Sequence, residues 1–173
     1  MPDLLLADHL LDTDRATRVV VHVKAYPYFT SDATMADVLA SVRRLRSGPA
    51  AEAGHRLWHA LRSGGLVVSA HPFSVAPRSY HDMPADLAAD FAAATVTIMK
   101  GDLNYRRLVG DRTWPADTPF EEVTNYFPGP VVALRTLKSD VVVGVPRDVL
   151  TTLDETGEPW RTSGAHALVQ VNG

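Results

Sequence analysis

The chain has 173 residues, of which 46% are hydrophobic and 21% charged, with a net charge of −3 and no cysteine. The acidic balance argues against a general nucleic-acid binder, and the lack of cysteine excludes disulfides and thiolate metal sites. Apolar stretches fall well short of the roughly 18 residues that cross a bilayer, and no basic segment precedes an apolar block at the N-terminus. We therefore expect a cytoplasmic protein that binds neither nucleic acid nor membranes.

Apolar periodicity predicts helices that alternate with strands along the chain. The predicted helices are 3–11, 34–46, 49–62, 84–93, 102–108, 120–125 and 146–153. The predicted strands are 18–23, 66–70, 95–99, 131–134, a short one at 141–143 and a last one at 166–171. This alternation predicts a single α/β domain over residues 1–173, a three-layer sandwich with a mainly parallel, Rossmann-like sheet.

Polar side chains follow three predicted strands at the point where each strand ends. A cation and a carboxylate follow each one: Lys24 and Asp32, Lys100 and Asp102, Lys138 and Asp140. Because open α/β sheets bind ligands at the carboxyl ends of their strands, we expect these side chains to converge on one site. The alternative is a set of capped helices with solvated charged faces, in which Asp102 is the N-cap of helix 102–108.

The usual nucleotide-binding and hydrolase signatures are missing from the sequence. It contains no GxGxxG or GxxxxGK[ST] motif and no GxSxG elbow, and Arg56 replaces the glutamate that a zincin needs after His55. Carboxylates beside lysines suit a different chemistry, because a hard divalent metal takes oxygen ligands and shares a phosphate with lysine or arginine. The pattern favours a site for metal and phosphate.

Two segments, 100–106 (KGDLNYR) and 135–138 (RTLK), carry a resemblance to a known family. They resemble the signatures of the damage-control phosphatase family, once called domain of unknown function eighty-nine, and the second indicates its acidic residue methyltransferase-like subfamily. The likeness extends over essentially the whole chain. It implies a phosphatase that depends on a divalent metal (manganese, magnesium, cobalt or nickel). It also implies small sugar phosphates as substrates, of the fructose 1-phosphate or fructose 6-phosphate type, and a role in metabolite damage control.

The resemblance also implies roles for particular residues. Asp32 matches a metal ligand of the family. The substrate-contacting positions match Asp102, Leu103, Asn104, Tyr105, Arg106 and Lys138. Family members carry two more metal ligands, an Asp-Asn pair, just ahead of the helix that matches 3–11. The chain thus resembles the C-terminal catalytic part of a longer protein, and alone we expect it to bind metal weakly, to hydrolyse little and to self-associate through an exposed sheet edge.

Two alternative functions remain open. One is a truncated, non-catalytic remnant that binds a sugar phosphate or a partner. The other is a carboxyl methyltransferase that uses S-adenosylmethionine, an activity attributed to relatives. The sequence disfavours this second alternative, because no glycine-rich loop follows the first strand and no acidic residue closes the second.

Overall fold

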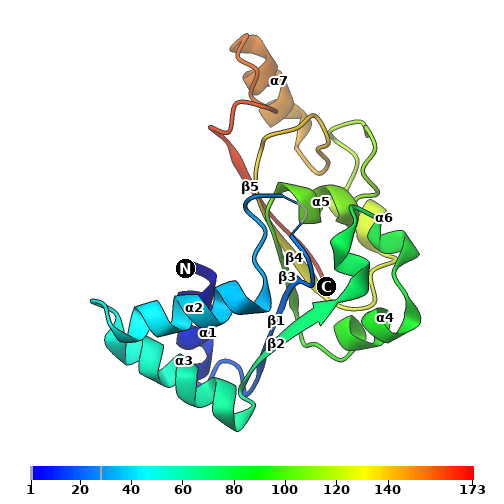
Figure 1. Ribbon diagram of the computed structural model, residues 1–173. Coiled ribbons are helices and arrows are strands. Elements are labelled where there is room, and N and C mark those ends of the chain that lie inside the picture. The colour runs from blue at the N-terminus through cyan, green and yellow to red at the C-terminus, as the bar shows by residue number, and fades with distance from the viewer. Residues whose placement is uncertain (1, 28) are drawn as a thin grey trace. The chain divides into compact units, whose positions relative to one another are not determined.

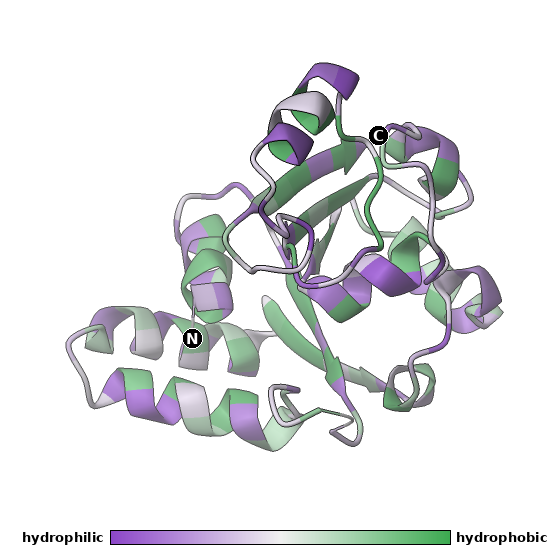
Figure 2. Cartoon of the chain, turned by 90° about the horizontal axis from the view of Figure 1, so that it is seen from above, coloured by the Kyte–Doolittle hydropathy of each residue, from purple (hydrophilic) through white to green (hydrophobic). Residues whose placement is uncertain are grey.

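The structure, a computed structural model, describes residues 2–27 and 29–173. The chain forms two compact units that divide between residues 76 and 77, and each unit has its own sheet (Figure 1). Strands are mostly apolar, whereas helices alternate between polar and apolar residues (Figure 2). No helix within residues 2–27 and 29–173 combines the length and the apolar character needed to cross a membrane.

The first unit packs helices against a parallel pair of strands. Its elements are α1 (Pro2–Asp12), β1 (Val19–Lys24), α2 (Met35–Arg46), α3 (Ala51–Ser63), β2 (Leu66–His71) and the 3-10 turn η1 (Pro72–Val75). The strands pair in register from Val19 with Leu66 to Lys24 with His71. The chain between β1 and α2 returns to the end of β1, where the Lys24 N–H donates to the Ala33 carbonyl at 2.9 Å.

Local sequence explains how the helices of this unit begin and pack. Helix α2 starts with a capping box, in which the side chains of Thr34 and Asp37 each accept a hydrogen bond from the other residue's backbone. Helix α3 approaches α2 so closely at Gly54 that an added Cβ would lie 2.4 Å from the Arg46 nitrogen. The core between helices and strands centres on fully buried Val42 and Leu57.

The second unit has a mixed sheet in the order β3-β4-β5. Its elements are η2 (Tyr80–Asp82), α4 (Ala85–Ala92), β3 (Thr97–Lys100), α5 (Asp102–Leu108), α6 (Phe120–Thr124), β4 (Val131–Thr136), α7 (Arg147–Glu155) and β5 (Ala167–Asn172). Strands β3 and β4 are parallel, and β5 runs antiparallel to β4. The segments that follow β3 and β4 therefore leave the sheet at the same edge.

The predicted α/β class with mostly parallel strands is confirmed, and it takes the form of two sheets. Helix and strand boundaries differ from the prediction by at most two residues. The predicted strand at 141–143 is wrong: this segment is buried but irregular. Side chains replace a neighbouring strand there, because the Val143 N–H donates to the Tyr105 hydroxyl at 3.2 Å and the Gln170 amide donates to the Val143 carbonyl at 2.7 Å. The single domain over residues 1–173 stays a prediction.

Candidate functional site

Arg135, in β4, is the centre of a hydrogen-bond network at the carboxyl ends of β3 and β4. Its side chain is completely buried, and its Nε and Nη2 lie 2.9 and 2.8 Å from one carboxylate oxygen of Asp102. The guanidinium also donates to the Ser139 hydroxyl at 2.7 Å and to the Val141 carbonyl. It lies over the Tyr105 ring, 4.4 Å from the ring centre. One buried cation thus fixes the first turn of α5 against the segment 138–141.

Asp102 does not cap its helix as the sequence had suggested. The N-cap of α5 is Gly101, whose positive φ of 95° is a conformation that glycine adopts without strain. Asp102 is the first helical residue, and its carboxylate accepts hydrogen bonds from Arg135 and from the Ser139 hydroxyl at 3.2 Å. The N-cap prediction is wrong because the Asp102 carboxylate pairs with the Arg135 guanidinium instead of the backbone N–H groups of its own helix. A hydrogen bond to a charged donor is stronger than one to a neutral N–H.

The middle of α5 is held from both sides by hydrogen bonds. The Asn104 amide donates to the Lys100 carbonyl at 3.0 Å, and its oxygen accepts from the Tyr80 hydroxyl at 3.3 Å. Tyr105 is fully buried, and burial raises the pKa of its phenol, although the hydrogen bond to Val143 and the charge of Arg135 oppose that rise. These contacts make α5 a rigid element beside the strand ends.

The remaining predicted positions on α5 are partly exposed. Leu103 is half-buried. Arg106 forms a two-pronged ion pair with Asp111, with distances of 2.7 and 3.1 Å. This hydrogen bonding to Asp111 raises the pKa of the Arg106 guanidinium. Arg106 therefore has a carboxylate partner in this structure, and a substrate anion would compete with Asp111 for it.

Lys138 differs from these residues in its environment. It is exposed, and its ammonium group makes no hydrogen bond or ion pair with the described part of the chain. The residues on either side are fixed, since Leu137 is buried and Ser139 is bonded to Arg135. A cation on a rigid segment with no partner of its own is well suited to bind an anionic ligand.

Asp32 lies in the first unit, after β1, whereas the predicted substrate residues all lie in the second. Its half-buried carboxylate accepts a hydrogen bond from the Phe29 N–H at 2.8 Å. A hard divalent cation takes six or more oxygen ligands, so this carboxylate fits one position in such a shell. Within residues 2–27 and 29–173, no group of three or more histidine or acidic side chains is placed to hold a metal ion. The convergence of Asp32 with Lys138 on one site stays a prediction.

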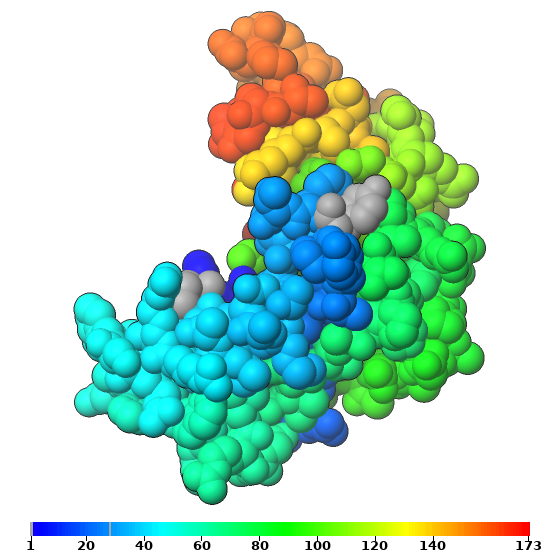
Figure 3. Space-filling view, viewed as in Figure 1, coloured from blue at the N-terminus to red at the C-terminus, as the bar shows by residue number. Residues whose placement is uncertain are grey.

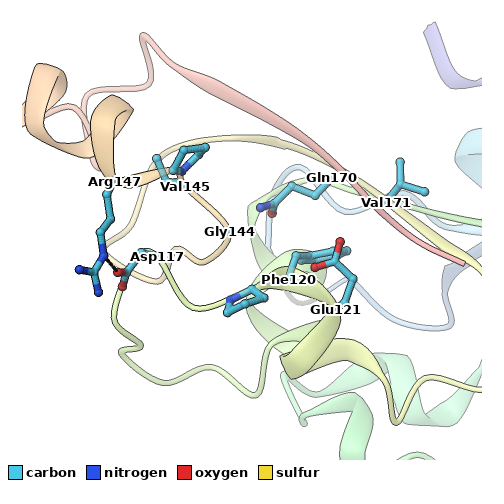
Figure 4. A pocket seen from close by; sticks show the side chains of 10 residues that line it. Asp117, Phe120, Glu121, Gly144, Val145, Arg147, Gln170 and Val171 are labelled. Carbon is cyan, nitrogen blue, oxygen red and sulfur yellow. Dashed lines mark hydrogen bonds and ion pairs between the residues drawn. The ribbon is translucent and has the colours of Figure 1, made fainter.

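A cavity lies elsewhere in the second unit. It has a volume of about 560 Å³ and is lined by residues from 117–121, 144–147 and 170–171 (Figure 4). Its charged pair is already satisfied: the Arg147 Nε lies 2.6 Å from an Asp117 oxygen, and this hydrogen bond lowers the pKa of Asp117. The predicted site residues do not line this cavity. The volume of the cavity is not by itself a reason to place the candidate site there.

The structure also reveals two residues whose burial and partners the sequence did not predict. Two arginines, Arg107 and Arg135, are buried, and Arg107 donates to the Arg78 carbonyl at 2.7 Å and lies over the Tyr80 ring. For Arg135 a signal existed, because it occupies an inward position of β4 where Val131 and Ala133 are apolar. An arginine side chain at such a buried position needs an anionic partner, because an unpaired buried charge is energetically costly.

His81 provides a prediction about pH. Its ring stacks on Tyr126 with centres 3.6 Å apart. Burial, followed by the positive charge of Arg112, lowers its pKa below the ordinary 6.5, and Asp82 only partly offsets this. The unfolded chain therefore binds this proton at a higher pH than the native state does. The stability that the neutral ring contributes is fully present above about 6.5 and is lost as pH falls through the native pKa.

We therefore expect the free energy of unfolding, measured with urea, to fall less between pH 7.5 and pH 5 in a His81→Phe variant than in the original chain. Phenylalanine keeps a ring for the stack but cannot bind a proton. An identical fall in both proteins would show that His81 does not contribute to the pH dependence.

The fold and this network define a class: an α/β protein whose polar residues gather at the carboxyl ends of parallel strands, where such proteins bind ligands. Residues 1–151 match the family described as the damage-control phosphatase ARMT1-like domain. The chain belongs to this family, which confirms the resemblance found in the sequence.

Among similar proteins are the damage-control phosphatases ARMT1 of Xenopus laevis, 34% identical over 177 residues, and of Danio rerio, 33% identical over 177 residues. The human protein of that name is 34% identical over 178 residues. The alignments cover 98 to 99% of this chain and 40% of each relative. The chain thus spans about two-fifths of the length of these relatives.

Proposed function

We propose that the polypeptide containing this chain is a metal-dependent phosphatase that acts on small sugar phosphates, of the fructose 1-phosphate or fructose 6-phosphate type, in metabolite damage control. Membership of a damage-control phosphatase family supports hydrolysis of a phosphate ester. The observation that carries the proposal is Lys138, an exposed cation on a segment that buried Arg135 holds in place. We propose the cytoplasm as the compartment, because a chain without cysteine requires no oxidising environment.

The proposed roles follow from the chemistry of the side chains. Lys138 binds the phosphoryl group and stabilises negative charge as it develops on the phosphoryl oxygens, which an exposed but fixed ammonium group does at little reorganisation cost. Asp32 contributes one oxygen ligand to a divalent metal, which when bound would polarise the phosphoryl group. The substrate-contacting role of Asp102, Leu103, Asn104, Tyr105 and Arg106 is part of the proposal. In this structure the Asp102 carboxylate accepts a hydrogen bond from Arg135, and the Tyr105 hydroxyl accepts one from the Val143 N–H.

The test is phosphate release by the complete natural polypeptide that contains these residues. Fructose 1-phosphate and fructose 6-phosphate are supplied with Mn²⁺, Mg²⁺, Co²⁺ or Ni²⁺ in turn, and with a chelator as the control. We expect release that needs a metal. An Asp32→Asn variant should require a higher metal concentration for half-maximal rate, because it loses one charged oxygen ligand.

Two outcomes would refute this function. Binding of the sugar phosphate without any release of phosphate, under every metal, would support the non-catalytic alternative. Transfer of a methyl group from S-adenosylmethionine to a carboxylate, in the absence of phosphate release, would support the methyltransferase.

A further inference from the structure

A small cavity of about 220 Å³ lies beside the segment that carries Lys138. Its wall is formed by Asp140 and by residues 158–162, which are Glu158, Pro159, Trp160, Arg161 and Thr162. Of these residues, only Asp140 is among the polar side chains expected at the carboxyl ends of the strands, and none has a predicted binding role. In the space-filling view, the yellow segment around residue 135 and the red segment near the C-terminus are in contact on the face shown (Figure 3).

Backbone hydrogen bonds join the residue before Lys138 to the chain that follows the cavity wall. The Leu137 N–H donates to the His166 carbonyl at 2.8 Å, and the Gly164 N–H donates to the Leu137 carbonyl at 2.9 Å. Along the segment, Lys138 and Asp140 are exposed, whereas Ser139 between them turns inward to Arg135. Two positions apart along a chain means at most about 7 Å between Cα atoms. Lys138 therefore lies two positions along the chain from the cavity wall, and it is not itself one of the residues that line the cavity.

The floor of the cavity is rigid. The Trp160 side chain is buried, and its indole N–H donates to the Asp154 carboxylate at 2.8 Å. The Arg161 guanidinium lies over this indole ring, 4.9 Å from the ring centre, and forms no ion pair within the described residues. The stacking contact holds Arg161 at the wall while its donors remain available for a ligand.

The charged side chains in the cavity wall determine which kind of ligand the cavity can bind. Asp140 and Glu158 are exposed carboxylates with no ion-pair partner in the part of the chain that the structure describes. With Arg161 they give the cavity a net charge of −1. Carboxylates accept hydrogen bonds from hydroxyl groups, and a guanidinium donates to hydroxyl and ring oxygens. A second phosphate would instead be repelled by two carboxylates against a single arginine.

We propose that this cavity is a subsite for the hydroxyl-bearing body of a sugar monophosphate, and that Asp140 and Glu158 select it against a bisphosphate. The inference rests on the proposed function in one respect, which is that the phosphate group binds at Lys138. It assigns to Asp140, Glu158 and Arg161 the recognition of the non-reacting end of the substrate.

Binding measured without turnover tests the subsite. Calorimetry on the complete polypeptide in a chelator gives dissociation constants for inorganic phosphate, fructose 6-phosphate and fructose 1,6-bisphosphate. In the Asp140→Asn, Glu158→Gln double variant we expect fructose 6-phosphate to lose about 10-fold in affinity relative to inorganic phosphate. The bisphosphate should gain at least 10-fold, because two negative charges have been removed. A Glu155→Gln variant, which removes an exposed carboxylate at the end of α7, serves as the matched control and should change neither ratio.

The failure of the subsite and the failure of the proposed function are distinguishable. If the ratio of the affinities for fructose 6-phosphate and phosphate is the same in the double variant and the original, or if neither ligand binds, the subsite is overturned. Phosphate release with metal is measured separately on the same proteins. If the ratios shift as expected while no phosphate is released, the subsite stands and the phosphatase assignment fails.

Discussion

Replacement of Lys138 by alanine in the complete polypeptide should lower the turnover of a sugar phosphate by a factor on the order of 10² to 10³. This is the loss expected when a charged donor to the transition state is removed. Lys138 is exposed and makes no hydrogen bond or ion pair within the described residues, so the free energy of unfolding should change by less than about 0.5 kcal/mol. Steady-state kinetics and urea denaturation measure the two effects.

A Lys138→Arg variant separates charge from position. Arginine keeps the positive charge but presents it as a planar fork, so partial activity is expected, between that of alanine and that of lysine. An Arg62→Ala variant removes an exposed cation at the end of α3 and serves as a surface control that should leave turnover unchanged. Full activity in Lys138→Ala would show that the lysine is only a solvated surface group.

Replacement of Arg135 by methionine should reduce the free energy of unfolding by about 3 to 5 kcal/mol, the cost of removing one partner of a buried ion pair. The Arg135 side chain is completely buried, and the Asp102 side chain is only 23% exposed. The substitution leaves the Asp102 carboxylate without its cation and the Val141 carbonyl without a donor. Chemical denaturation gives the loss, and a fall in melting temperature should accompany it.

A second substitution tests the reason for this loss. In the Arg135→Met, Asp102→Asn double variant the uncompensated charge is gone, so we expect part of the lost stability to return. The Arg62→Ala variant should again unfold like the original chain. If Arg135→Met costs less than about 1 kcal/mol, or if the double variant is no more stable than the single one, the ion pair does not hold α5 to the segment 138–141.

The sequence by itself was sufficient for the family and for the secondary structure outside segment 141–143. Runs of β-branched residues such as Val131–Val132 predict strands because their stiff side chains fit a pleated, buried surface. Proline at the start and glycine at the end of apolar helical patterns placed the helix boundaries within two residues. The motifs around Asp102 and Lys138 carry the resemblance to the family, and the match of residues 1–151 to that family confirms it.

Only the tertiary structure decided the partners of the polar groups. Asp102 and Arg135 are 33 positions apart, and nothing local predicts that they form a pair. Segment 141–143 has the composition of a strand, yet the Val143 N–H and carbonyl form hydrogen bonds with the side chains of Tyr105 and Gln170 instead of with another strand. Local patterns predict which residues are buried, because the spacing of apolar residues marks the face of a helix or strand that packs into the core. Which donor meets which acceptor depends on how distant elements pack, since a buried charge takes its partner from whatever the fold brings within reach.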